Sequence, residues 1–222
     1  MNLKNQLVKI CHKVYEKGFV AAFDGNLSVR LDKGRFLITR SAVNKGDVTE
    51  ADILTIDSNG NLIDGIGKIT TEAKLHLKIY NTRKEINSVI HCHPVYSTAI
   101  ASSREQFPNN IFPEVILTLG KVPICNYSTP STNKLADSLD PFIDFANVFL
   151  LSNHGAVAVG TTIESAYFRM EKLEHVSKTI FIAESIGNLK KLSNEQIEEL
   201  YYIAETTYGI KISENNKVNI NA

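Results

Sequence analysis

Four side chains in this sequence have the types and the spacing to bind a metal ion and move a proton. His91 and His93 lie two residues apart in a segment expected to be a strand, so both imidazoles project from one face. His154 lies far along the chain, in a turn before Gly155, so only the tertiary fold can bring it to the pair. Three neutral imidazoles with an open fourth position are a typical catalytic zinc site, in which the metal acts as a Lewis acid. A histidine pair on a strand can also be a half-exposed polar face, but the addition of His154 favours the metal.

Glu72 is the candidate acid/base residue. It opens an expected helix, where the free N–H groups of the first turn favour an acidic side chain. A glutamate at such a place more often only stabilises the helix dipole, but beside a metal it could move a proton on and off carbon. The histidines at positions 12, 76 and 175 lie within helical stretches and are expected to be surface or packing residues.

Small polar residues near turns could bind an anion. Backbone N–H groups and hydroxyls can converge on one at Gly25-Asn26, at Ser41 and at Thr70-Thr71. Each signal alone is weak, because turns are rich in such residues. The sequence contains no Gly-x-Gly-x-x-Gly, P-loop or nucleophile-elbow motif, so neither nucleotide binding nor Ser-His-Asp catalysis has support.

The elements that must position these residues alternate between strands and helices. Apolar periodicity predicts a first helix from Leu3 to Gly18, a long helix from the capping box at Thr161 to Gly187, and a final helix from Ser193 to about Tyr202. Residues 213–222 are polar enough to be a flexible tail. Between these segments we expect helices at Thr71–Arg83 and Ser131–Leu139, and strands at Asn26–Leu31, Arg35–Thr39, Asp52–Asp57, Ser88–His93, Val148–Leu151 and Ala156–Val159. A tight turn, Asp32-Lys33-Gly34, joins the first two strands. Hairpins mixed with helices favour an α/β layered domain with a largely antiparallel sheet.

Composition bounds the class of protein. The 222 residues suffice for one sizeable domain, and 43% hydrophobic with 22% charged residues is ordinary globular composition. The 24 basic and 24 acidic residues balance, so there is no electrostatic footprint for nucleic acid or an anionic membrane. The three cysteines are odd in number and widely spaced, which fits a reducing cytoplasm. We find no stretch of signal-peptide or membrane-spanning length, and expect a soluble cytoplasmic protein.

The order of the motifs is more specific than any one of them. It resembles the class II aldolase and adducin-head family, over roughly Leu3 to Ile210, and is most similar to the members that act on L-fuculose 1-phosphate. The resemblance implies one domain over residues 1–222, with a three-layer α/β/α fold around a mostly antiparallel sheet. It also implies a homotetramer with active sites at subunit interfaces. The matching blocks are Gly25-Asn26-Leu27-Ser28, Ile38-Thr39-Arg40-Ser41-Ala42, Thr70-Thr71-Glu72 with His76, His91-Cys92-His93-Pro94 and Asn153-His154-Gly155.

The resemblance also assigns roles by position. It places the zinc ligands at His91, His93 and His154, and the acid/base residue, which also approaches the metal, at Glu72. A proton-donating tyrosine that reaches the neighbouring subunit's site falls on Tyr208. The residues that cradle the substrate phosphate fall on Gly25, Asn26, Ser41, Ala42, Thr70 and Thr71.

The sequence departs from the family pattern at three places. Ala42 stands where the family usually has glycine, and a backbone geometry that needs glycine would be strained there. Arg40 stands where the family usually has proline. The aromatic residue that lines the aldehyde site falls near Phe112-Pro113, which has no tyrosine, so the aldehyde specificity stays open.

The activity that the resemblance implies is reversible cleavage of a ketose 1-phosphate to dihydroxyacetone phosphate and an aldehyde, by a zinc-dependent enzyme. The expected substrate is L-fuculose 1-phosphate or a close deoxy-sugar analogue, and manganese or cobalt could replace zinc. Sugar-phosphate 4-epimerases of the family carry Asp at the position of Glu72, whereas a dehydratase also keeps Glu. An adducin-like head that has lost its metal and only binds proteins is the alternative from another class, and the retained histidines and Glu72 argue against it.

Overall fold

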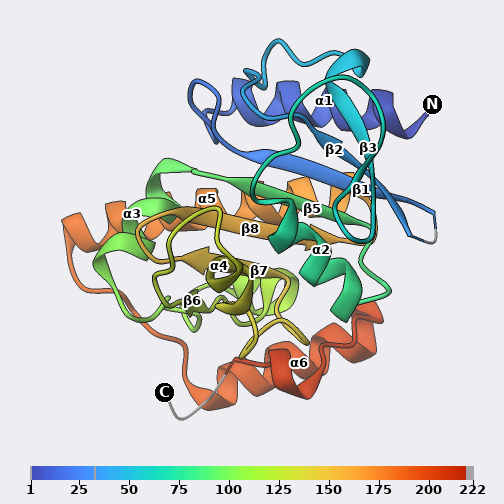
Figure 1. Cartoon of the computed structure of the whole chain (residues 1–222). Coiled ribbons are helices and arrows are strands. Elements are labelled where there is room, and N and C mark those ends of the chain that lie inside the picture. Colours follow the sequence, from blue (N-terminus) through green and yellow to red (C-terminus); the bar gives the residue numbers. More distant parts are fainter. Residues whose placement is uncertain (1, 33, 219–222) are drawn as a thin grey trace.

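An eight-stranded sheet organises the fold, in the order β4-β3-β2-β1-β5-β8-β7-β6 (Figure 1). The structure, a computed structural model, describes residues 2–32 and 34–218. Every neighbouring pair of strands is antiparallel except β6 and β7, which are parallel. The strands are β1 (Asn26–Asp32), β2 (Arg35–Thr39), β3 (Ile53–Asp57), β4 (Leu62–Asp64), β5 (Ser88–Cys92), β6 (Ile124–Cys125), β7 (Val148–Leu151) and β8 (Gly155–Gly160). Lys33, in the expected hairpin turn, lies outside the described residues.

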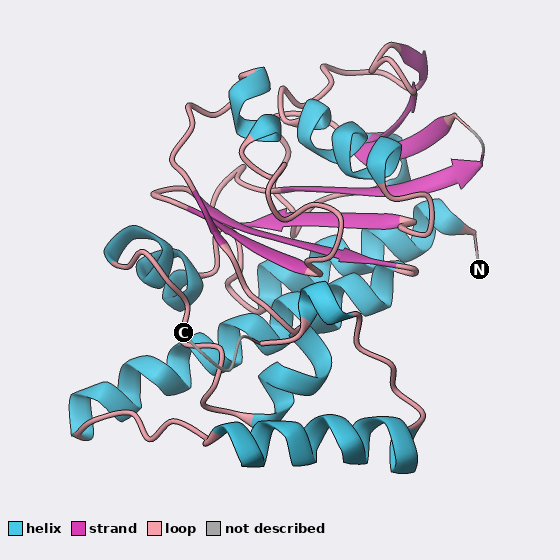
Figure 2. Ribbon diagram, turned by 90° about the horizontal axis from the view of Figure 1, so that it is seen from below, coloured by secondary structure: helices cyan, strands magenta, loops and turns pink. Residues whose placement is uncertain are grey.

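Helices cover both faces of this sheet, which gives the expected α/β/α layering (Figure 2). The larger core lies under α1 (Leu3–Glu16), α3 (Val95–Ser103) and α5 (Ile163–Ile186). The second core lies under α2 (Ala73–Thr82) and α4 (Asn133–Asp137). In β5, Ile90 and Cys92 join the first core and Val89 joins the second, so the buried strand alternates between the two faces.

Helix α2 begins at Ala73, two residues after the expected start at Thr71. Glu72 itself is the N-cap residue, and its side chain makes no capping hydrogen bond. The Thr70 hydroxyl accepts a 3.4 Å hydrogen bond from the Glu72 backbone N–H, and the Thr71 hydroxyl bonds the Ser131 hydroxyl at 2.6 Å. The Glu72 carboxylate is therefore free to point away from its own helix.

The final helix is longer than the sequence predicts. The capping box of Ser193 with Gln196 starts α6 (Asn194–Tyr208), which continues beyond Tyr202. After α6 a short 3-10 turn, η3 (Glu214–Asn216), follows, and the Asn216 side chain accepts a 3.0 Å hydrogen bond from the Lys121 backbone N–H. Val218 packs in a small core with Tyr201 and with η2 (Val115–Leu119). Residues 213–218 thus contact other elements, the flexibility of the tail stays a prediction, and residues 219–222 lie outside the described part. Within that part, no helix has the length and apolar character needed to cross a membrane.

Candidate active site

The pairing of β5 with β8 brings the three histidines together. His91 lies opposite Val157 in this antiparallel pair, and His93 follows the end of β5 directly. The turn between β7 and β8 carries His154, after Asn153 in a left-handed conformation with φ 55°. Gly155 then passes so close to β5 that a Cβ atom there would lie 2.5 Å from the Cys92 carbonyl oxygen. Only glycine allows this approach without a shift of the backbone.

The predicted metal ligands converge on one point. One ligand atom from each imidazole lies within 4.8 Å of the other two, and Nε2 of His91 and Nε2 of His93 are 3.1 Å apart. The Glu72 carboxylate closes the group, with Oε2 3.3 Å from Nε2 of His91 and Oε1 3.3 Å from Nε2 of His154. The four predicted metal ligands, Glu72 among them, therefore share a single site.

The polar contacts behind His91 and His93 prepare these two rings for a cation, whereas Nδ1 of His154 is buried without a hydrogen-bond partner among the described residues. His91 is buried, and burial lowers the pKa of its imidazole to about 3, so the ring is neutral at neutral pH. Nδ1 of His91 donates a 3.0 Å hydrogen bond to the Ala156 carbonyl oxygen, which leaves a lone pair on Nε2. Asp24 lies 3.6 Å from Nδ1 of His93 and favours the same tautomer there. Lone pairs and a carboxylate facing one another suit a divalent cation, so the donor set fits zinc.

The Glu72 carboxylate is ionised in this environment. Burial alone would raise the pKa of Glu72, but the neighbouring His91 and the hydrogen bonds from His154 and Asn26 outweigh it. The pKa of Glu72 is therefore held well below its ordinary value. In this state the carboxylate can bind a cation or accept a proton.

A cavity of about 180 Å³ opens beside the histidines. Gly25 has a φ of 72°, and a Cβ atom on it would lie 2.8 Å from the His91 carbonyl oxygen, so the turn requires glycine. Ala42 also has a left-handed φ, of 56°, and carries the strain that its departure from glycine predicts. Glu72 and His93 line the cavity together with all six predicted phosphate-binding residues, which are Gly25, Asn26, Ser41, Ala42, Thr70 and Thr71.

Several residues at this cavity were missed as site residues. Arg40 lines the wall, and its Nε donates a 2.6 Å hydrogen bond to the Asp52 carboxylate. Lys45 is buried behind the cavity, where its ammonium donates to the carbonyl oxygens of Val43 at 2.9 Å and Phe23 at 3.3 Å. It thus ties together the two loops that carry Gly25 and Ala42. A lysine near a turn gives no sequence signal for this, whereas Arg40 in place of proline was a visible departure.

His76 is a buried packing histidine, within the expectation for it, but it also makes polar contacts that the sequence did not predict. Its ring is buried, and Nε2 lies 2.6 Å from the side-chain oxygen of Asn26 while Nδ1 lies 2.6 Å from the Ser28 hydroxyl. Asn26 in turn donates a 2.7 Å hydrogen bond to Glu72. His76 is therefore connected to the candidate site through one residue.

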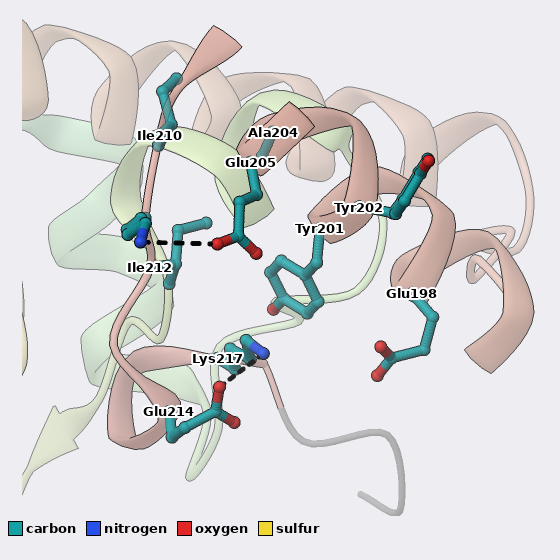
Figure 3. A pocket seen from close by; sticks show the side chains of 10 residues that line it. Glu198, Tyr201, Tyr202, Ala204, Glu205, Ile210, Ile212, Glu214 and Lys217 are labelled. Carbon is teal, nitrogen blue, oxygen red and sulfur yellow. Dashed lines mark ion pairs between the residues drawn. The ribbon is translucent and has the colours of Figure 1, made fainter. Parts of the chain in front are cut away.

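Tyr208 is not brought to the histidines within this chain. It lies in the last turn of α6 with 64% of its surface exposed, and it does not line the cavity beside Glu72. A larger cavity of about 360 Å³ lies between α6 and residues 210–217, and none of the predicted site residues lines it (Figure 3). Its two lysines, Lys211 and Lys217, are paired with Glu205 and Glu214 (Figure 3).

Two relatives are similar in sequence over most of this chain. L-fuculose phosphate aldolase from Methanococcus maripaludis (strain C7) is 34% identical over 191 residues, which cover 86% of this chain and 100% of the relative. A 3-oxo-tetronate 4-phosphate decarboxylase from Haemophilus influenzae is 30% identical over 201 residues, which cover 89% of this chain and 95% of the relative.

Two solved structures are similar to this chain in fold. An L-fuculose 1-phosphate aldolase superposes with a TM-score of 0.82 at 31% identity, covering 89% of this chain and 93% of the other. YgbL from Escherichia coli, described as a putative aldolase/epimerase/decarboxylase, has a TM-score of 0.82 at 27% identity, covering 89% and 97%. Residues 5–181 match the family model of the Class II Aldolase and Adducin N-terminal domain. The chain therefore belongs to the class II aldolase and adducin N-terminal domain family.

Proposed function

We propose that this protein is a zinc-dependent aldolase that reversibly cleaves a ketose 1-phosphate to dihydroxyacetone phosphate and an aldehyde. The proposed substrate is L-fuculose 1-phosphate or a close deoxy-sugar analogue. One observation carries the proposal: three histidines and an ionised glutamate adjoin a cavity lined by six small groups suited to a phosphate. The similarity to relatives named L-fuculose phosphate aldolase supports the substrate.

The metal would be held by His91, His93 and His154, with Glu72 as a further ligand before substrate binds. A zinc ion there supplies a Lewis acid that stabilises negative charge on a substrate carbonyl oxygen. The donor set also tolerates other divalent ions, such as manganese or cobalt. The hydrogen bond from His91 to the Ala156 carbonyl and the contact of His93 with Asp24 hold the two rings in a metal-binding orientation.

In the direction of synthesis, the phosphate of dihydroxyacetone phosphate would lie in the cradle next to Glu72. Backbone N–H groups and hydroxyls would hold the phosphate, which fixes the carbon that reacts beside the carboxylate. Glu72 would take a proton from that carbon, and the electron pair of the broken C–H bond would pass to the adjacent carbonyl group. The carbon then attacks the aldehyde carbonyl, and a proton is needed at the aldehyde oxygen.

We propose Tyr208 as the donor of this last proton, contributed from a neighbouring copy in a homotetramer. Its exposed position at the end of α6 leaves it available to another subunit. In the cleavage direction the same phenol would act as the general base. We place the enzyme in the cytoplasm, since its three cysteines are free and buried.

Decarboxylation of a 3-oxo acid phosphate is a second candidate. A relative with this name covers 89% of the chain, as much as the aldolase relatives do. The two reactions share one requirement, which is a negative charge developing on a carbon next to a carbonyl group. In the decarboxylation the C–C bond to a carboxylate breaks, carbon dioxide leaves, and the carbon that keeps the electron pair takes up a proton, so the substrate needs a proton donor there and no proton removal by Glu72.

Product analysis separates these activities. We would measure dihydroxyacetone phosphate released from L-fuculose 1-phosphate, and carbon dioxide released from 3-oxo-tetronate 4-phosphate, for the wild type, Glu72→Gln and the surface control Glu85→Gln. The aldolase proposal expects the first product from the wild type and the control, and its loss in Glu72→Gln with zinc still bound. Carbon dioxide alone would favour the decarboxylase. Neither product from a metal-loaded protein would favour an epimerase or dehydratase, and absence of metal would favour an adducin-like binding head.

A further inference from the structure

A chain of buried hydrogen bonds runs from Glu72 into the second core. Asn26 and Ser28 lie on one face of β1, while Glu72, His76 and Tyr80 follow one another at turn spacing at the start and along α2. Asn26 donates to Glu72 at 2.7 Å, His76 lies 2.6 Å from both Asn26 and Ser28, and Ser28 lies 2.8 Å from the Tyr80 hydroxyl. The strand and the helix are thus joined by five consecutive polar side chains.

The direction of each hydrogen bond follows from the Glu72 end. An ionised carboxylate only accepts, so the group of Asn26 that faces Glu72 is its NH₂, and its oxygen faces His76. His76 must therefore carry its proton on Nε2, which leaves Nδ1 as an acceptor for the Ser28 hydroxyl. The Ser28 oxygen can then accept from the Tyr80 hydroxyl. Burial lowers the pKa of His76 to about 4, which agrees with the single proton that this chain requires.

We propose that His76 is a positioning residue that locks the Asn26 side chain with its NH₂ group toward the active site. Asn26 lines the cavity, and one of its two amide N–H bonds is used by Glu72. The other is available to a phosphate oxygen, so this inference rests on the proposed phosphate cradle. A flipped amide would turn its carbonyl oxygen toward the carboxylate and the phosphate, and both contacts would be repulsive. Ser28 and Tyr80 act one step further back, because a Ser28 hydroxyl that accepts from Tyr80 is left to donate to Nδ1 of His76, which favours the same tautomer.

Two substitutions separate positioning from packing. His76→Gln keeps one donor and one acceptor in place of the imidazole, whereas His76→Leu fills the site without either. We expect His76→Leu to weaken binding of inorganic phosphate and to raise KM for L-fuculose 1-phosphate, each roughly tenfold or more. We expect His76→Gln to restore both to within roughly threefold of the wild type, with zinc content unchanged in all three proteins.

A spectroscopic measurement tests whether His76 locks the Asn26 amide, and it needs no activity assay. In ¹⁵N-labelled wild-type protein, His76 should show a proton on Nε2 and none on Nδ1 at neutral pH. A proton on Nδ1 would overturn the inference. So would unchanged phosphate affinity in His76→Leu, or an equal loss in the Leu and Gln variants.

Two further measurements distinguish a failure of this inference from a misfolded variant and from a failure of the proposed activity. If His76→Leu does not fold, Tyr80→Phe replaces it, since it removes only the last hydroxyl and should lower the fraction of His76 protonated on Nε2. An unchanged tautomer population in Tyr80→Phe would then contradict the role of Ser28 and Tyr80. If the wild type releases no dihydroxyacetone phosphate but binds inorganic phosphate and shows the Nε2 proton, the proposed activity fails while the lock stands.

Discussion

Replacing the His76 imidazole should change how the stability of the fold depends on pH. His76 is 1% exposed, and burial lowers its pKa from the ordinary 6.5 to about 4. The folded state favours the neutral ring, so His76 contributes to the unfolding free energy in a pH-dependent way. This contribution is fully present above pH 6.5 and is lost as the pH falls toward 4. From pH 7 down to about pH 4.5, proton uptake by the unfolded chain at this one residue should remove about 2 kcal/mol of unfolding free energy.

Urea unfolding of the wild type and of His76→Gln measures this contribution as a difference. Both proteins would be treated with a chelator and compared at one protein concentration, since metal binding and assembly also shift stability. His91 and His93 titrate in both proteins, so their contributions cancel to first order. His175→Gln, which removes an exposed histidine on α5, is the matched control. The wild type should lose about 2 kcal/mol more than His76→Gln on acidification. Equal losses in the two proteins would refute the neutral buried state of His76.

Three further substitutions test the loops around the cavity. Ala42→Gly should raise the unfolding free energy by about 0.5–1 kcal/mol, because relief of the left-handed strain exceeds the entropy cost of glycine, and an unchanged urea midpoint would contradict that strain. Gly25→Ala should raise KM for the phosphorylated substrate tenfold or more, because the added Cβ would lie 2.8 Å from the His91 carbonyl oxygen and must displace the turn. A KM equal to that of the wild type would show that the turn does not require glycine. Lys45→Met should lower the unfolding free energy by about 1–3 kcal/mol, because the carbonyl oxygens of Phe23 and Val43 lose their hydrogen-bond donor. A variant as stable as the wild type in urea would show that these two oxygens bond to another donor.

Local sequence signals predicted the parts of the fold that depend on local chemistry. Short strand-like runs and turn residues located β5, β7 and β8, and the capping box of Ser193 with Gln196 located the start of α6. The capping box of α5 was placed wrongly, because the structure has Thr162 with Ser165 as the box, not Thr161 with Glu164. The spacing of His91 and His93 predicted two imidazoles on one side of a strand, and their Nε2 atoms do face each other at 3.1 Å. The correct predictions succeeded because each depends on residues close together in the sequence.

Local sequence signals could not predict features that depend on contacts between elements far apart in the chain. Periodicity gives the face of a strand but not its neighbour, so the pairing of β5 with β8 that brings His154 to His91 came only from the fold, or from the family resemblance. His76 has apolar neighbours on its helix, and its polar partners lie on β1. The extra turns of α6 and the burial of Val218 depend on packing against η2, which a polar C-terminal sequence does not reveal.

The zinc content of the purified protein, measured together with dihydroxyacetone phosphate release from L-fuculose 1-phosphate, tests the central claim most directly. The account predicts about one zinc per chain, loss of release on chelation, and recovery when zinc is restored. A protein that binds no metal at His91, His93 and His154, or one whose release of dihydroxyacetone phosphate survives removal of the metal, would contradict it.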